Sequence, residues 1–207
     1  MLKKEIEQLY LVFSNNKPPD KILNFDCVSC LTKEEELYLL KTPLRELNNH
    51  IFGSIMESCN VIEMGNECYK FYIPRILELT TNESSDFSFS FAEYVYHDFA
   101  KFDYKGTFDQ KEIKAIDDFF YSFLEQEFSR DENERDESEI FNITETGFNP
   151  NHFLEKISRQ KKWTKIKYEL KYYLELQKEW AKSEQEFEEW INKGKRKEIL
   201  RYLVNEK

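Results

Sequence analysis

Apolar side chains recur every three to four residues through most of this chain, and this spacing predicts amphipathic helices. The helices predicted in the first hundred residues cover 2–14, 32–41, a stretch opened by Pro74, and 86–103. Residues 60–72 are the best strand candidate, because aromatic side chains crowd Glu67–Tyr72. We therefore expect an all-α fold, an irregular helical bundle with at most a minor β element near residues 60–72.

Capping signals mark where several of these helices begin. Thr32–Glu35 and Thr107–Gln110 are capping-box patterns, and the second opens the clearest amphipathic helix of the first half. Thr42–Pro43 pairs an N-cap residue with a proline at the first helical position, where a missing N–H costs nothing. These signals predict a helical core domain over residues 1–128.

An acidic run interrupts the helical pattern after residue 128. Asp131–Glu139 contains six acids and one base in nine residues, so like-charge repulsion favours a solvated segment. Asn149–Asn151, with Pro150 at its centre, then punctuates the chain. We predict an acidic loop over residues 129–149.

The C-terminal part of the chain is strongly helical by pattern. Residues 151–193 contain neither Gly nor Pro. Seven apolar residues advance there in steps close to 3.5, as in a coiled-coil seam: Trp163, Ile166, Leu170, Tyr173, Trp180, Phe187 and Ile191. A single helix of this length would be about 60 Å long, so it must break, project or pack against a partner. We predict a long helical C-terminal segment over 150–207, either one long helix or a helical hairpin.

Composition supports the helical interpretation and narrows the class of protein. Five glycines and five prolines in 207 residues are too few for the turns of a strand-rich fold. Charge is uneven: the net charge is -10, but residues 155–207 hold 15 basic and 10 acidic side chains, a net of +5. The sequence has no apolar run long enough for a membrane span and no secretory signal, so we expect a cytoplasmic protein.

Cysteine and histidine supply the candidate chemistry. Cys27 and Cys30 form a CxxC pair, a spacing at which two thiolates can share a zinc ion. The remaining cysteines, Cys59 and Cys68, do not form a second such pair, so we expect ordinary reduced thiols and no cofactor, with a zinc site as the alternative.

The sequence contains one candidate general base. Tyr96–Asp98 could place the imidazole of His97 beside a carboxylate as a general base. The sequence has neither a GxSxG nucleophile turn nor a glycine-rich phosphate loop. We therefore expect no catalytic residues and no enzymatic activity.

Binding remains as the expected role. The basic stretch that begins at Lys156, with Trp163, Tyr168 and Tyr172 interleaved, could follow a nucleic acid. Nearby glutamates balance it, however, and the acidic chain repels phosphate. We expect the partner to be another protein with a basic surface, or a second copy of this chain. The predicted partner-binding residues are Asp131, Glu132, Glu134, Asp136, Glu137, Glu139, Trp163, Tyr173 and Trp180.

Three segments carry a resemblance to known proteins: Cys27–Cys30 (CVSC), Thr42–Leu47 (TPLREL) and Tyr72–Leu79 (YIPRILEL). In this order, over residues 20–128, they resemble a family of small bacterial proteins of unknown function. The acidic helical profile is also similar in type to immunity proteins that neutralise polymorphic toxins.

The resemblance to immunity proteins carries no residue-by-residue match. It implies a non-catalytic protein-binding module that neutralises a toxin by direct binding. The alternatives are a homo-oligomeric scaffold built through the C-terminal helix, and a zinc-stabilised nucleic-acid-binding protein.

Overall fold

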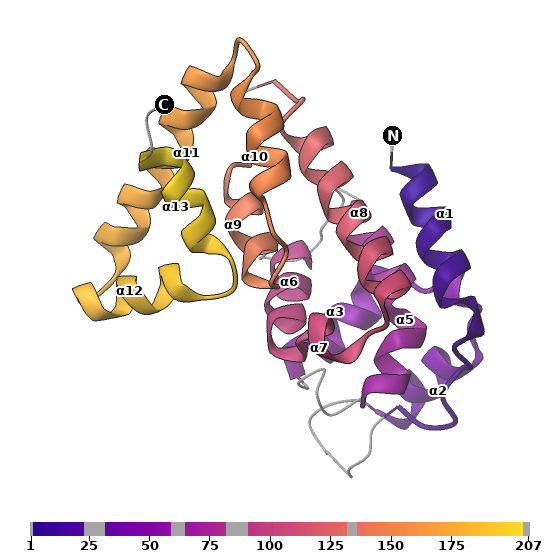
Figure 1. Ribbon diagram of the computed structural model, residues 1–207. Helices are drawn as coiled ribbons and strands as arrows, with labels where there is room; N and C mark the ends of the chain where they lie inside the picture. The colour runs from indigo at the N-terminus through magenta and orange to yellow at the C-terminus, as the bar shows by residue number, and fades with distance from the viewer. Residues whose placement is uncertain (1, 23–31, 59–64, 82–90, 132–135, 205–207) are drawn as a thin grey trace. The chain divides into compact units, whose positions relative to one another are not determined.

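The computed structural model describes residues 2–22, 32–58, 65–81, 91–131 and 136–204 (Figure 1). Every regular element in these ranges is helical, which confirms the predicted all-α class. The chain divides into two compact units, Met1–Phe119 and Phe120–Lys207. The division falls inside helix α8 (Gln110–Glu127), whereas the sequence pattern placed the end of the first domain at residue 128.

The first unit is assembled around helix α5. Its helices are α1 (Lys3–Val12), α2 (Lys33–Lys41), α3 (Asn49–Ser58), α5 (Asn66–Leu79), α6 (Phe91–Phe102), α7 (Tyr104–Thr107) and the start of α8, with 3-10 turns at Phe13–Asn15 and Leu44–Glu46. Helix α5 contacts α1, α3, α6 and both 3-10 turns. Its Tyr69 ring packs against Phe99 and Phe102, with centroids 5.6 and 4.7 Å away. Large rings thus fill this core.

Two helix starts test the predicted capping boxes. The Thr32–Glu35 box is confirmed: Glu35 N–H donates to Thr32 Oγ1 at 3.2 Å, and Thr32 N–H donates to Glu35 Oε2 at 2.8 Å. The second box is wrong by two residues, because Thr107 belongs to α7. Asp109 and Glu112 cap α8 instead, each accepting the other's backbone N–H at 2.9 Å.

The predicted β element is also corrected. Glu67–Tyr72 is helical, because Tyr69, Tyr72, Ile73 and Ile76 point into the core at helical spacing. Pro74 does not open this helix but lies inside it, where its ring nitrogen cannot donate to a carbonyl one turn earlier. Residues 60–64 of that element and 86–90 of the predicted 86–103 helix lie outside the described residues.

The second unit contains the rest of α8 and five further helices. These are α9 (Ser138–Glu145), α10 (Asn151–Ser158), α11 (Trp163–Trp180), α12 (Glu184–Asn192) and α13 (Arg196–Val204). Helix α13 contacts α9, α10 and α12, and α11 contacts α12. The predicted acidic loop over 129–149 contains helix α9, which buries Ile140, Phe141 and Ile143.

The predicted helical segment over 150–207, expected as one long helix or a hairpin, consists of the four helices α10, α11, α12 and α13 among the described residues. Ala181 leaves the helical region with φ −64° and ψ 131°, and Ser183 starts α12 by accepting the Glu186 N–H at 3.1 Å. The seam residues Ile166, Leu170 and Ile191 are buried, but they belong to two helices. A capping signal thus interrupts the apolar repeat.

Candidate functional site

A buried arginine, Arg196, links helix α12 to helices α9 and α13. Arg196, 3% exposed, is the first residue of α13. Its Nε donates to the Phe141 carbonyl at 3.1 Å, its Nη1 donates to the Trp190 carbonyl at 3.0 Å, and it forms an ion pair with Glu145. Its guanidinium carbon also lies 4.4 Å from the centre of the Trp190 ring. One side chain therefore joins α9, α12 and α13.

The corner between α12 and α13 sits against the end of α9. Gly194 has φ +55°, and a Cβ there would lie 2.2 Å from the Thr144 carbonyl oxygen and 2.5 Å from that of Glu145. The next residue, Lys195, donates its backbone N–H to the Thr144 oxygen at 2.8 Å. Only glycine fits this approach, so the corner caps α9 and sets the direction of α12.

Aromatic rings from α9, α11 and α12 pack against one another. Tyr173 stacks on Phe141 with centroids 4.9 Å apart, and Trp190 lies 5.7 Å from Phe141 and 6.0 Å from Phe187. The Tyr173 ring is therefore largely committed to contacts within the unit, although the sequence predicted it as a partner-binding residue.

Three rings on α11 remain open to solvent. Tyr168 is 71% exposed, Tyr172 58% and Trp180 67%, and no other aromatic side chain among the described residues is more than half exposed. Tyrosine and tryptophan are enriched at protein interfaces because they combine a large apolar area with a polar group. Among the described residues, the most exposed phenol and indole rings thus lie on α11.

The charges around these rings fall into two groups. We define the acidic surface as Trp180 with the exposed glutamates of α12, namely Glu184, Glu186, Glu188 and Glu189. We define the basic face as Lys161, Lys165, Tyr168, Lys171 and Tyr172, all exposed on α11 or just before it. Residues 181–183 connect Trp180, the last residue of α11, to the first residue of α12 (Figure 1).

The predicted acidic partner-binding residues are only partly brought to the surface. Asp131 and Asp136 are exposed and Glu137 is half-buried. Glu139 is corrected: it is only 9% exposed on the inner side of α9 and cannot steer a partner. Glu132 and Glu134 lie outside the described residues.

Among the predicted rings, Trp180 is exposed, whereas Trp163 is half-buried and edge-on to Tyr202 at 6.1 Å. The predicted set omitted Tyr168, Tyr172 and the α12 glutamates. The exposure of the two tyrosines could have been predicted from the sequence, because they are four residues apart, on one side of the helix, and do not belong to the apolar seam.

Two of the three segments that carry the family resemblance, Thr42–Leu47 and Tyr72–Leu79, are joined in the first unit. Arg75 Nε donates to the Leu47 carbonyl at 2.7 Å, and its Nη1 contacts Glu78 at 2.6 Å. Tyr10 donates to the same Glu78 carboxylate at 2.7 Å, and the Arg45 guanidinium covers the Tyr10 ring at 3.8 Å. These contacts tie α1, the Leu44–Glu46 turn and α5 together, so the motif residues have a structural role.

The two ionisable side chains of the Tyr96–Asp98 candidate differ in exposure. His97 is exposed on α6, whereas Asp98 is 4% exposed. Burial raises the pKa of Asp98 to about 6, although Lys101 Nζ lies 3.6 Å from its Oδ1. In the part of the chain that the structure describes, no three His, Cys, Asp or Glu side chains are placed to hold a metal ion. The CxxC pair, Cys27 and Cys30, lies outside that part.

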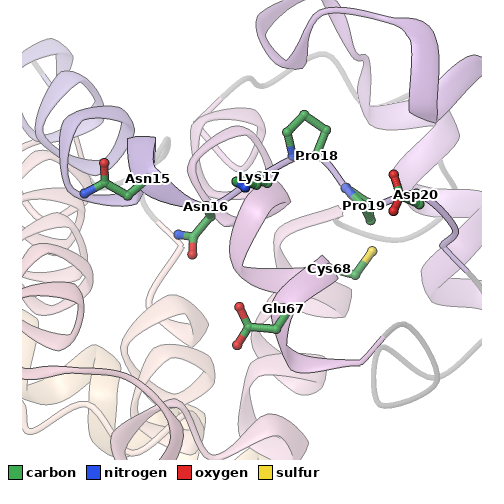
Figure 2. Close-up of a pocket in the computed structure, with 8 residues that line it drawn as sticks. All are labelled: Asn15, Asn16, Lys17, Pro18, Pro19, Asp20, Glu67 and Cys68. Atoms are coloured by element: carbon green, nitrogen blue, oxygen red, sulfur yellow. The ribbon is translucent and has the colours of Figure 1, made fainter.

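A hollow of about 450 Å³ in the first unit is lined by residues 15–20, Glu67 and Cys68 (Figure 2). Figure 2 draws the Cys68 sulfur on the side of Pro19 and Asp20, with the Glu67 carboxylate pointing away from them. Burial raises the pKa of the Cys68 thiol to about 12, so it stays protonated at neutral pH. The hollow therefore presents polar side chains but no reactive thiolate.

The remaining findings concern the whole chain. Among the described helices, none combines the length and apolar character that crossing a bilayer requires. Comparisons with protein-family models, curated proteins and solved structures find no match to this chain.

Proposed function

We propose that this chain is a non-catalytic protein-binding module whose acidic surface docks onto a basic face of another protein. The observation that carries the proposal is Trp180, which is 67% exposed and lies four residues before α12, whose four glutamates are also exposed. Tryptophans at the centre of an interface are among the residues that contribute most to affinity. A ring of carboxylates beside such an anchor selects a cationic partner.

Electrostatics favours the same kind of partner at longer range. The chain has a net charge of -10, and Asp131 and Asp136 add exposed carboxylates to the second unit. A field of this sign attracts a basic protein and raises its association rate at low salt. This is the chemistry expected of an immunity-type protein that covers the basic cleft of a toxin, and we propose that role as the specific form of the function.

The rigidity of α12 supports the proposal energetically. Arg196 bonds to the Trp190 carbonyl near the end of α12, and Gly194 holds the following corner against α9. A helix that is already fixed before binding loses little conformational freedom when the partner arrives, so more of the contact energy appears as affinity.

The test begins by identifying the partner. A photo-crosslinking amino acid at position 180 traps the protein that contacts the acidic surface in native cells. Association with the purified partner is then measured against salt concentration for a Glu184→Gln/Glu188→Gln/Glu189→Gln variant. Glu186 is kept, because its Oε2 accepts the Lys182 N–H at 2.7 Å and helps to cap α12.

The matched control removes three exposed glutamates from the first unit: Glu34→Gln/Glu46→Gln/Glu93→Gln. We expect the α12 variant to associate more slowly at low salt with a flatter salt dependence, and the control to change both quantities less. Trp180→Ala is expected to weaken binding by about 2 kcal/mol, mostly through faster dissociation. Equal association rates for the α12 variant and the control would refute the proposal.

A further inference from the structure

The second unit also exposes cations and rings that the proposed function does not use, on the basic face of α11. Lys165, Tyr168, Lys171 and Tyr172 share one side of the helix at i,i+3 and i,i+4 spacing, and all are exposed. The opposite side is buried through Ile166, Leu170 and Leu174. The half-buried Glu169 follows Lys165 by four residues, and the first exposed carboxylate of α11 is Glu175, so the exposed side chains in the first half of the helix include rings and ammonium groups but no carboxylate.

We propose that a second copy of this chain occupies the acidic surface, and that it does so with its basic face. This inference rests on the proposed function in one respect, since it takes the acidic surface to be a docking site for a basic protein. It goes further by naming that protein's chemistry: three lysines and two tyrosines on an exposed helix side.

The inference rests on the opposite charges of the acidic surface and the basic face. The acidic surface presents four glutamates and one indole ring, and the basic face presents three lysines and two phenol rings. Both lie in the same unit, on α11 and α12, so every copy supplies both partners of the contact. A two-fold arrangement would make the contact twice and close the assembly as a dimer.

Trp180 lies at the junction between the two surfaces along the chain. It ends α11 and therefore lies between the basic face and α12 along the chain. In the proposed two-fold contact, each copy's basic face meets the other copy's α12 glutamates. A nucleic acid is the weaker occupant, because the net charge of -10 repels phosphate before any stacking can occur.

Charge exchange between the two surfaces tests the proposal. We expect the wild-type chain to self-associate in sedimentation velocity at about 50 mM salt and to dissociate at about 500 mM. Lys165→Glu/Lys171→Glu and Glu184→Lys/Glu188→Lys should each weaken self-association by about tenfold or more. An equimolar mixture of these two variants should associate again, because each then carries the charges that the other needs.

The control is Lys4→Glu/Lys111→Glu, which reverses two exposed lysines of the first unit and should leave self-association unchanged. A wild-type chain that stays monomeric at every concentration, or a variant mixture that stays monomeric while the wild type pairs, would overturn the proposal. So would binding of a labelled oligothymidylate by the monomer that is lost in Lys165→Glu/Lys171→Glu, since the basic face would then belong to nucleic acid.

The same variants separate this inference from the proposed function. Lys165→Glu/Lys171→Glu leaves the acidic surface intact, so it should lose self-association and keep the crosslinked partner. If that variant loses neither, the self-contact is refuted while the proposed function stands. If the α12 glutamine variant keeps its normal partner association but loses self-association, the proposed function is refuted and the self-contact stands.

Discussion

Removing the Arg196 side chain should destabilise the second unit more than any single change at its surface. Arg196→Met keeps much of the side-chain volume but deletes the bonds to the Phe141 and Trp190 carbonyls and the ion pair with Glu145. The arginine is 3% exposed, and the Glu145 side chain is 14% exposed. Breaking a buried ion pair by removing one partner costs about 3–5 kcal/mol, because the remaining charge is left poorly solvated.

The size of this effect can be separated into its parts. Arg196→Met/Glu145→Met replaces both charges by apolar groups, and such replacements are often close to neutral. We therefore expect the double variant to recover more than half of the loss. Arg201→Met is the matched control: Arg201 also pairs with a glutamate, Glu198, at 2.8 Å, but its side chain is 66% exposed and the pair should contribute less than about 1 kcal/mol.

Urea unfolding followed by tryptophan fluorescence measures these changes. The three tryptophans, Trp163, Trp180 and Trp190, all belong to the second unit, so the signal reports on that unit alone. A loss below about 1 kcal/mol for Arg196→Met, or an equal loss for Arg201→Met, would show that the buried arginine does not hold the helices together.

Two further predictions concern a glycine and a buried acid. Gly194→Ala should lower the free energy of unfolding by at least about 2 kcal/mol, because the new Cβ would lie 2.2 Å from the Thr144 oxygen and the backbone there is left-handed. A melting temperature lowered by less than about 4 °C would contradict this prediction. The pKa of Asp98 is raised from 3.8 to about 6, so between these pH values the folded chain holds more protons than the unfolded chain. This group's contribution to stability therefore falls as pH rises, by about 3 kcal/mol in all. Asp98→Asn should flatten that slope in urea titrations followed by circular dichroism, and an unchanged slope would argue against the raised pKa.

Local signals in the sequence accounted for the fold class and for some helix ends. The spacing of apolar residues and the Thr32–Glu35 box depend on neighbours within one turn, and both survive in the structure. The same kind of signal was present at Ser183–Glu186, but the longer apolar repeat concealed it. At α9, the acids of the preceding run obscured Ile140 and Phe141, whose burial depends on helices elsewhere in the chain.

The candidate surface was harder to predict, for a physical reason. Whether a ring is exposed depends on which helix faces it. Tyr173 and Trp180 belong to the same apolar repeat, but only Tyr173 has Phe141 to stack on. Arg196 looks like any other cation in a basic stretch, and its burial follows from partners 51 and 55 residues away. Contacts of that range are not encoded in local spacing.

The capping of α9 by the α12–α13 corner has a consequence for synthesis. The Thr144 carbonyl accepts a hydrogen bond from the backbone N–H of Lys195, and Glu145 pairs with Arg196, 51 positions downstream. As the nascent polypeptide leaves the ribosome, α9 is thus exposed well before the groups that close its end have been translated. During that interval its apolar side lacks the cover that the folded chain gives it, and apolar surface exposed in this way favours association with other chains.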